Sequence, residues 1–158
     1  MFIGGHKNDI ANWIIKKSLD DDNPVTPKKL QKMLYYSYAW GLVFLNESSA
    51  DLQNKLFDAE FEAWVHGPVD PSIYHQYKQY GFGAIDEEVE YPNLDEKASK
   101  ILNDVWEAYG HLDGDQLEYV THQELPWQKK RVGREPGSPS NDKLEDTDMF
   151  EYYGAQLI

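Results

Sequence analysis

The stretch T-P-K-K-L-Q-K-M-L-Y-Y-S-Y-A-W, residues 26 to 40, decides the fold of this chain. Thr26 is a favourable N-cap residue, and Pro27 suits the first helical position, where a missing backbone N–H costs no hydrogen bond. Apolar residues then recur at helical spacing, and aromatic residues fill most of the remaining faces. A helix that is apolar nearly all round belongs in the interior, so we expect a central buried helix over about residues 26–45.

Polar residues interrupt the apolar surface of this expected helix at Lys29, Gln31 and Lys32. Burying a polar or charged group without a partner is costly. These side chains are therefore expected either to reach the surface or to pair with buried acids, such as Glu60 or Glu62.

Capping residues followed by apolar residues at helical spacing predict further helices on both sides of the central one. One helix precedes it, with Asn8 or Asp9 as its N-cap. The later helices are expected to begin at Asp70, Asp95, Asp113 and Asp146 or Thr147, with one more short turn starting at Pro126. This number of helical signals predicts a mainly α-helical domain.

From Phe57 to Val65 the spacing changes, since apolar residues hold the odd positions and mostly acidic residues hold the even ones. A period of two is typical of a half-buried strand, although Ala and Glu are poor strand formers and a helix competes with this interpretation. We expect a turn over residues 66–69 and a second extended piece over residues 89–91. The predicted fold is a compact, mainly α domain with one or two short β-strands near residues 57–65 and 89–91.

The length of the chain and its lack of internal repeats predict a single domain over residues 1–158. Residues 132–143, V-G-R-E-P-G-S-P-S-N-D-K, have no apolar anchor apart from Val132. Gly, Pro and Ser at this density are typical of a loop, so we expect a mobile loop within the domain.

The formal net charge of -13 is concentrated in the second half of the chain. Residues 1–80 carry 8 Lys and Arg against 10 Asp and Glu, whereas residues 81–158 carry 7 against 18. An acidic surface repels phosphate backbones, so direct nucleic-acid binding is not expected, whereas a basic protein partner would be attracted. The alternative is that the surplus carboxylates serve only solubility.

The chain contains no cysteine, which excludes disulfides and thiolate metal sites and fits a reducing compartment. No apolar run approaches the roughly 18 residues of a membrane span, and the N-terminal residues lack the apolar core of a signal peptide. We therefore expect a cytoplasmic protein that does not bind membranes.

Enzyme motifs are absent from the sequence, which has no nucleophile elbow, no glycine-rich phosphate loop and no His-x-x-x-His pair. We expect a protein that is not an enzyme and needs no metal or cofactor. The competing hypothesis is a metal-assisted hydrolase that would use His66, His122 and Glu124. For His122 a hydrogen-bonded structural role is the preferred interpretation.

A short basic run, Lys129, Lys130, Arg131 and Arg134, adjoins the acidic C-terminal segment. Read alone it resembles a basic patch. Because acidic residues lie close by in the sequence, neutralisation of those carboxylates is the expected role.

Aromatic residues make up 14% of the chain, and some are adjacent, as in Tyr35-Tyr36 and Tyr152-Tyr153. Adjacent residues point about 100° apart on a helix, so not all of these rings can be central. Rings left at the surface are the usual anchors of protein interfaces. The alternative is that all of them belong to the core.

A series of aromatic, basic and turn residues follows a recognisable order along the chain. It consists of Thr26, Lys29 to Tyr36, Ala39-Trp40, Phe57, Phe61 to Trp64, Gly67 to Val69, Pro71, Tyr74, Tyr77, Thr121-His122 and Pro126-Trp127. From about Asn8 to Tyr153 the chain resembles the SocA-like antitoxin family, known as the Panacea domain and formerly described as phage-associated GepA-like proteins. Met33 stands where leucine is usual, a change that a core tolerates.

The resemblance implies a compact, mainly helical antitoxin of a toxin–antitoxin pair, often encoded on prophages and other mobile elements. Members of the family look like direct protein neutralisers, and at least one branch is thought to deliver its toxin to a bacterial protease. We therefore expect a cognate toxin protein as the partner, neutralised by direct binding, with delivery to a protease as the alternative. The family pattern identifies no catalytic residues.

Candidate partner-binding residues lie on the central helix and around the turn that follows the expected strand. They are Lys29, Lys32, Tyr36, Trp64, His66, Gly67 and Pro68. The leucines of the helix are expected to hold the core instead.

Overall fold

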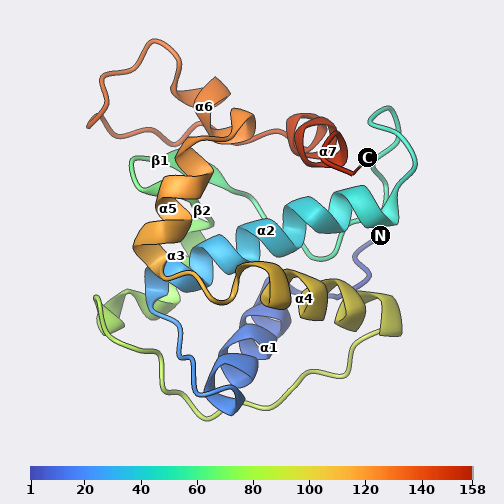
Figure 1. Cartoon of the computed structure of the whole chain (residues 1–158), viewed down its shortest axis with the longest axis vertical. Helices are drawn as coiled ribbons and strands as arrows, with labels where there is room; N and C mark the ends of the chain where they lie inside the picture. Colours follow the sequence, from blue (N-terminus) through green and yellow to red (C-terminus); the bar gives the residue numbers. More distant parts are fainter. Residues whose placement is uncertain (158) are drawn as a thin grey trace.

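The computed structural model describes residues 1–157, whose regular structure consists of seven α-helices, a 3-10 turn and a two-stranded sheet (Figure 1). In chain order the elements are α1 (Lys7–Asp20), α2 (Pro27–Leu45), β1 (Glu62–Trp64), β2 (Gly67–Val69), α3 (Pro71–Tyr77), the 3-10 turn (Lys78–Tyr80), α4 (Glu96–Tyr109), α5 (Gly114–His122), α6 (Leu125–Arg131) and α7 (Asp146–Gly154). The mainly α fold class predicted from the sequence is confirmed. In this part of the chain, no helix is both long and apolar enough to cross a membrane.

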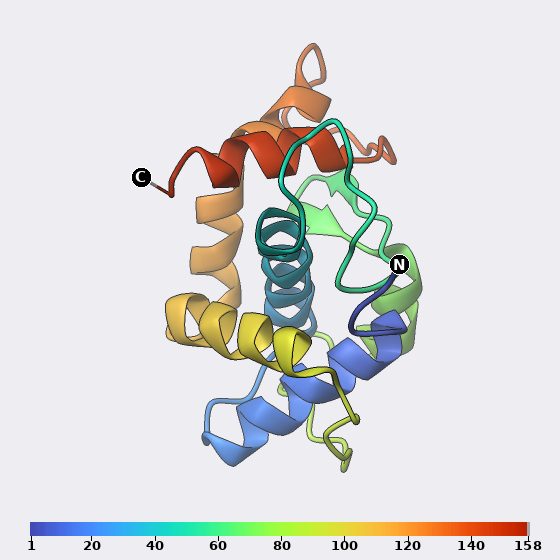
Figure 2. The same ribbon diagram turned by 90° about the vertical axis from the view of Figure 1, so that its right-hand side faces the viewer.

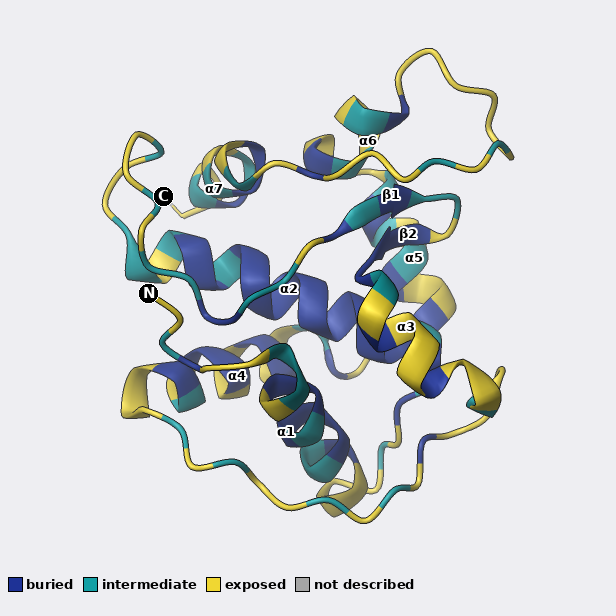
Figure 3. Ribbon diagram, turned by 180° about the vertical axis from the view of Figure 1, so that it is seen from behind, coloured by how far each residue is buried: buried dark blue, intermediate teal, exposed yellow. Residues whose placement is uncertain are grey.

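Helix α2 lies at the centre of the domain, as its sequence predicts. Figure 2 looks along this helix and shows α7, α5, α4, α1 and the β-hairpin arranged around it. Buried residues make up 14 of its 19 positions, which appear as a dark band across the middle of Figure 3. Because α1, α3, α4, α5, α7 and β2 all pack against it, α2 is the common wall of the hydrophobic core.

Thr26 begins α2 in the way that its sequence indicates. Its Oγ1 accepts a hydrogen bond from the Lys29 N–H at 3.2 Å, and Pro27 takes the first helical position. At the other end, the Asn46 side-chain amide donates to the Leu42 carbonyl at 3.0 Å. The predicted bounds of the central helix are therefore confirmed, and both of its ends are closed by side-chain hydrogen bonds.

Two lysines of α2, Lys29 and Lys32, are buried and bind backbone carbonyls rather than acids. Lys29 Nζ donates to the Gly110 carbonyl, which follows α4, at 2.6 Å. Lys32 Nζ donates to the Pro68 carbonyl in β2 at 3.2 Å. Each lysine thus ties α2 to a segment that is distant in sequence.

The glutamine of α2 acts in the same way. The Gln31 side chain exchanges two hydrogen bonds with the backbone of Asp70, at 2.8 and 3.1 Å. The expected pairing of these helical residues with Glu60 or Glu62 is wrong. Glu60 instead forms an exposed ion pair with Lys143 at 3.1 Å.

Tyrosine hydroxyls make a second set of bonds from α2. Tyr36 and Tyr153 both donate to Glu124 Oε1, at 2.7 and 2.8 Å, and the Tyr35 and Tyr153 hydroxyl oxygens lie 3.0 Å apart. Burial raises the pKa of the Glu124 carboxyl, and the two tyrosine hydrogen bonds act in the opposite direction. These contacts attach α7 and the junction between α5 and α6 to the central helix.

The two strands form an antiparallel hairpin in which Glu62 pairs with Val69 and Trp64 pairs with Gly67. The strand predicted over residues 57–65 is thus confirmed only over its last part. The turn predicted over residues 66–69 is wrong in part, because its last three residues form β2. Residues 89–91 form no strand, since no neighbouring strand pairs with them.

Helix starts follow the predicted caps at three positions and differ at two. The side chains of Asp70, Asp95 and Asp113 cap α3, α4 and α5 as predicted. The first helix begins earlier than expected, because His6 Nδ1 accepts the Asn8 N–H at 3.1 Å. The last helix follows Glu145, whose side chain makes no capping bond, and Asp146 is already helical.

Replacing Thr26 by Ala should lower the free energy of unfolding by about 1 kcal/mol, because the Lys29 N–H loses its partner at the start of the central helix. Thr26→Ser keeps a hydroxyl and serves as the matched control. Urea unfolding followed by circular dichroism measures both variants. Equal stability of the Ala and Ser variants would contradict the capping role.

Candidate functional site

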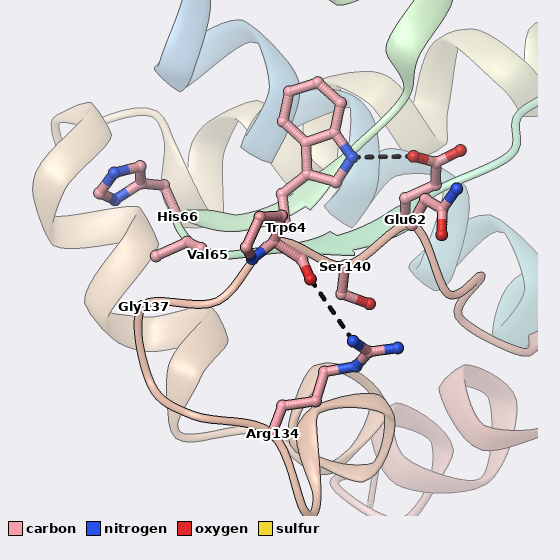
Figure 4. A pocket seen from close by; sticks show the side chains of 9 residues that line it. Glu62, Trp64, Val65, His66, Arg134, Gly137 and Ser140 are labelled. Carbon is pink, nitrogen blue, oxygen red and sulfur yellow. Dashed lines mark hydrogen bonds between the residues drawn. The ribbon is translucent and has the colours of Figure 1, made fainter.

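A groove of about 800 Å³ lies between the β-hairpin and the loop that follows α6. One wall consists of Glu62, Trp64, Val65 and His66, and the other consists of Arg134, Gly137, Pro139, Ser140 and Asn141. Figure 4 shows the Trp64 side chain on the hairpin side and the Arg134 side chain on the loop side. Two of the predicted partner-binding residues, Trp64 and His66, therefore line this groove.

Trp64 is held by two contacts of its side chain and one of its backbone carbonyl, and it remains half-buried. Its Nε1 donates to Glu62 Oε1 at 2.8 Å. Its ring packs edge-to-face on Tyr74 with the ring centres 5.0 Å apart, and its carbonyl accepts the Trp127 Nε1–H at 2.8 Å. An aromatic surface that is already ordered loses little conformational entropy when a partner covers it.

His66 stands at the tip of the hairpin with 68% of its side chain exposed. Its Nδ1 lies 3.0 Å from Glu118 Oε2, and Lys28 Nζ donates to the other oxygen of that carboxylate at 2.7 Å. Partial burial raises the pKa of Glu118, but the hydrogen bonds from Lys28 and His66 outweigh it and hold the pKa below its ordinary value. The hairpin tip is thereby attached to both α2 and α5.

Gly67 brings the hairpin against the interior. Its φ of +105° lies in the region that favours glycine, and a Cβ there would lie 2.7 Å from Lys32 Cε and 2.9 Å from Thr121 Oγ1. Burial lowers the pKa of the Lys32 ammonium to about 7. The close approach of Gly67 therefore seals Lys32 behind the hairpin, where it holds the Pro68 carbonyl.

Arg131 organises the opposite wall. Its Nη1 donates to the Ala63 carbonyl of β1 at 3.2 Å, and its Nη2 donates to three carbonyls within residues 135–138 at distances of 2.9 to 3.3 Å. Further along the loop, the Asp142 carbonyl accepts the Ala63 N–H at 2.8 Å. Within the segment over 132–143, residues 135–138 are thus held by Arg131 and Asp142 is bonded to β1. Mobility of the segment stays a prediction.

The basic run after α6 is largely paired with acids, as the sequence predicts. The pairs are Lys129 with Asp148 at 3.0 Å, Lys130 with Glu145 at 3.3 Å and Arg134 with Asp142 at 2.8 Å. Arg131 is the exception, because its guanidinium binds carbonyls instead of a carboxylate.

The other predicted partner-binding residues lie inside the domain. Lys29, Lys32 and Tyr36 are at most 4% exposed, and Gly67 and Pro68 are also buried. In this fold they offer no side-chain surface to a partner, because their groups bind other parts of the same chain. Partner contact therefore stays a prediction for Trp64 and His66, the two predicted residues that line the groove.

The three residues named for a metal-assisted hydrolase each contact different partners. His66 binds Glu118, and Glu124 accepts the two tyrosine hydroxyls. The His122 ring stacks on Trp127 at 4.0 Å, and burial lowers its pKa. Within residues 1–157, no group of three His, Cys, Asp or Glu is placed to hold a metal ion.

Comparison with known families adds a finding that geometry alone does not supply. The family model described as "Antitoxin SocA-like, Panacea domain" matches residues 30–128, which is more than half of the chain. This protein belongs to the SocA-like antitoxin family. The matched part of the Panacea domain begins inside α2 and ends inside α6, so it contains the hairpin wall of the groove and not the loop wall.

A relative of this Panacea domain is "Antitoxin SocA" of Caulobacter vibrioides (strain NA1000 / CB15N), which is 33% identical over 72 residues. The match covers 46% of this chain and 35% of the relative, so the chain spans about a third of the relative's length. No solved structure matches the chain.

The sequence prediction missed the loop wall of the groove and the acid that holds the hairpin tip. The sequence predicts Arg131 and Arg134 only as partners of nearby carboxylates and gives no role to Glu118. A signal for Glu118 existed, because it lies three residues before Thr121 on the same helical face. For Arg131 no local signal distinguishes binding to carbonyls from binding to acids.

The stability of Lys32→Met relative to the native protein should be highest below about pH 7 and should fall as the pH rises towards 10.5. The pKa of Lys32 is about 7 in the folded state and 10.5 in the unfolded chain, so between these values the unfolded state binds the extra proton. The native protein therefore gains stability as the pH rises through this window, whereas the Met variant lacks that gain.

Urea unfolding across this pH range measures the difference between Lys32→Met and the native protein. Lys97→Met, at an exposed position on α4, is the control for removal of a lysine. A stability difference that stays constant with pH would contradict the buried titration of Lys32.

Proposed function

We propose that this protein is an antitoxin that neutralises a cognate toxin protein by binding it directly, without catalysis, metal or cofactor. Membership of the SocA-like antitoxin family, through the match over residues 30–128, is the observation that carries the proposal. The similarity to the Caulobacter antitoxin supports it over a shorter range.

The groove beside the hairpin supports a binding role and is the proposed contact surface. Two of its charged side chains already have partners within the chain: Glu62 binds the Trp64 indole, and Arg134 binds Asp142. Such groups can recognise shape and charge without offering a free base or nucleophile. Trp64 adds a ring of the kind that most often anchors protein interfaces.

The charge of the chain supports a basic toxin surface as the partner. A net charge of -13 accelerates encounter with a cationic protein and opposes encounter with nucleic acid. Electrostatic attraction of this kind contributes more to association rate and specificity than to final affinity.

Coexpression with the toxic product of the neighbouring gene should restore growth and give a complex that survives size-exclusion chromatography. Direct neutralisation also predicts that the toxin's half-life in cells is unchanged when this protein is present, because the toxin is blocked rather than degraded. Absence of both rescue and complex with every adjacent toxic product would refute the proposal. Rescue with a shortened toxin half-life would favour delivery to a protease instead.

Trp64→Ala should weaken the complex with that toxin about tenfold or more, since a groove wall loses its aromatic surface. Tyr119→Ala is the matched control, because Tyr119 is 68% exposed on α5 and does not line the groove. Calorimetric titration measures the affinities, and thermal unfolding checks that both variants fold. Equal affinity of the Trp64 variant and the native protein would remove the groove from the contact surface.

A further inference from the structure

Residues 80–83, Tyr-Gly-Phe-Gly, form a tight turn that presents an almost fully exposed phenylalanine. Gly81 has φ 59° and ψ -118°, the combination required at the second position of a type II′ turn and rarely adopted by residues with a side chain. The Gly83 N–H closes the turn on the Tyr80 carbonyl at 2.8 Å. Phe82 is 96% exposed, the highest value among the large apolar residues described.

The residues on both sides of this turn are held in place by contacts with the domain and with each other. Ile85 is fully buried, and its N–H donates to the Val25 carbonyl at 2.8 Å. The Tyr80 hydroxyl donates to Glu87 Oε2 at 2.8 Å, which joins the two sides of the turn. Because both flanks are held, the backbone at Phe82 has a defined position, and less backbone conformational entropy is lost when a partner covers the ring.

The segment after the turn alternates between the core and the solvent. Ile85 and Val89 face the core, and Glu87 between them binds Tyr80. The exposed positions in the same segment are Asp86, Glu88 and Glu90, which we call the acidic ridge. An extended segment with one side bonded to the domain thus presents three carboxylates in a row, directly after an exposed ring.

We propose that Phe82 and the acidic ridge form a docking surface for a basic protein, in which the ring enters an apolar pocket and the carboxylates face Lys or Arg beside it. The inference rests on the proposed antitoxin function and names a contact that the toxin makes. It is separate from the groove: in Figure 1 the segment between α3 and α4 runs along the lower edge of the domain, whereas the loop after α6 lies at the upper edge.

The negative charge beside Phe82 favours a cationic protein over a membrane or a nucleic acid as the binding partner. An exposed aromatic ring could also enter a membrane surface or stack on a nucleic-acid base. Anionic lipid headgroups and phosphate backbones would both be repelled by Asp86, Glu88 and Glu90 at close range. A cationic protein surface is attracted instead, and an aromatic anchor beside charged residues is the common composition of an interface hot spot and its rim.

Phe82→Ala tests the inference by titration of the full chain against the toxin encoded by the neighbouring gene. Its dissociation constant should rise about 10- to 100-fold, as expected when a buried phenylalanine ring is removed. The melting temperature of the variant should match that of the native protein, because the ring is 96% exposed in the fold. Tyr119→Ala, which removes another exposed ring, should leave the dissociation constant unchanged.

Two further variants test the turn and the acidic ridge separately. Gly81→Ala meets no atom within 4 Å, so it acts only through the strained backbone and should weaken binding less than Phe82→Ala does. Replacing Asp86, Glu88 and Glu90 by their amides should slow association in stopped-flow measurements and reduce its dependence on salt.

The outcomes distinguish this inference from the function on which it rests. Binding by the native protein with an equal dissociation constant for Phe82→Ala would overturn the docking surface and leave the antitoxin function standing. Failure of the native protein to bind any adjacent toxic product would overturn both. Binding of the native protein to phosphatidylserine vesicles that is lost in Phe82→Ala would overturn the protein partner in favour of a membrane.

Discussion

Hydrogen bonds from buried polar side chains of α2 to distant backbone groups hold the rest of the domain in place. Lys29, Gln31 and Lys32 reach, respectively, the end of α4, the junction of β2 with α3, and β2 itself. A buried carbonyl without a partner is costly, so each contact both satisfies a backbone group and fixes the position of its segment. The low pKa of Lys32 is a consequence of this arrangement, because the hairpin excludes water from its ammonium group.

Buried polar side chains also connect α2 to α7 and α6, and through α6 to the groove. Glu124 accepts two tyrosine hydroxyls and so connects α2 and α7 to the start of α6. Arg131, at the end of α6, then binds the carbonyls of β1 and of the following loop. The groove walls are therefore positioned by a chain of buried polar contacts that begins at α2, although no residue of α2 lines the groove.

Each of the two proposed contact surfaces combines an aromatic ring with charged side chains, but the two surfaces are formed in different ways. The groove consists of segments brought together by tertiary contacts, with Trp64 and Arg134 on its facing walls. The surface at Phe82 is a local turn followed by an acidic ridge, held by the buried Ile85 and by the hydrogen bond between Tyr80 and Glu87. In Figure 1 the segment between α3 and α4 and the loop after α6 lie on different sides of the domain, so a single partner that contacts both surfaces has to reach from one segment to the other. Effects of mutations at the two surfaces are expected to add, because distant sites do not share partners.

Local patterns in the sequence determined the mainly helical fold, the bounds of α2 and the caps of α3, α4 and α5, because helix periodicity and capping act within a few residues. They also indicated Trp64 and His66 as surface candidates beside the hairpin. Only the tertiary structure decided where Lys29 and Lys32 bind, since a long side chain can reach many partners and the burial cost is met by whichever carbonyl folding places nearby. The loop wall of the groove and the outward direction of the acidic ridge were likewise decided by contacts between segments far apart in the chain, which no local pattern records.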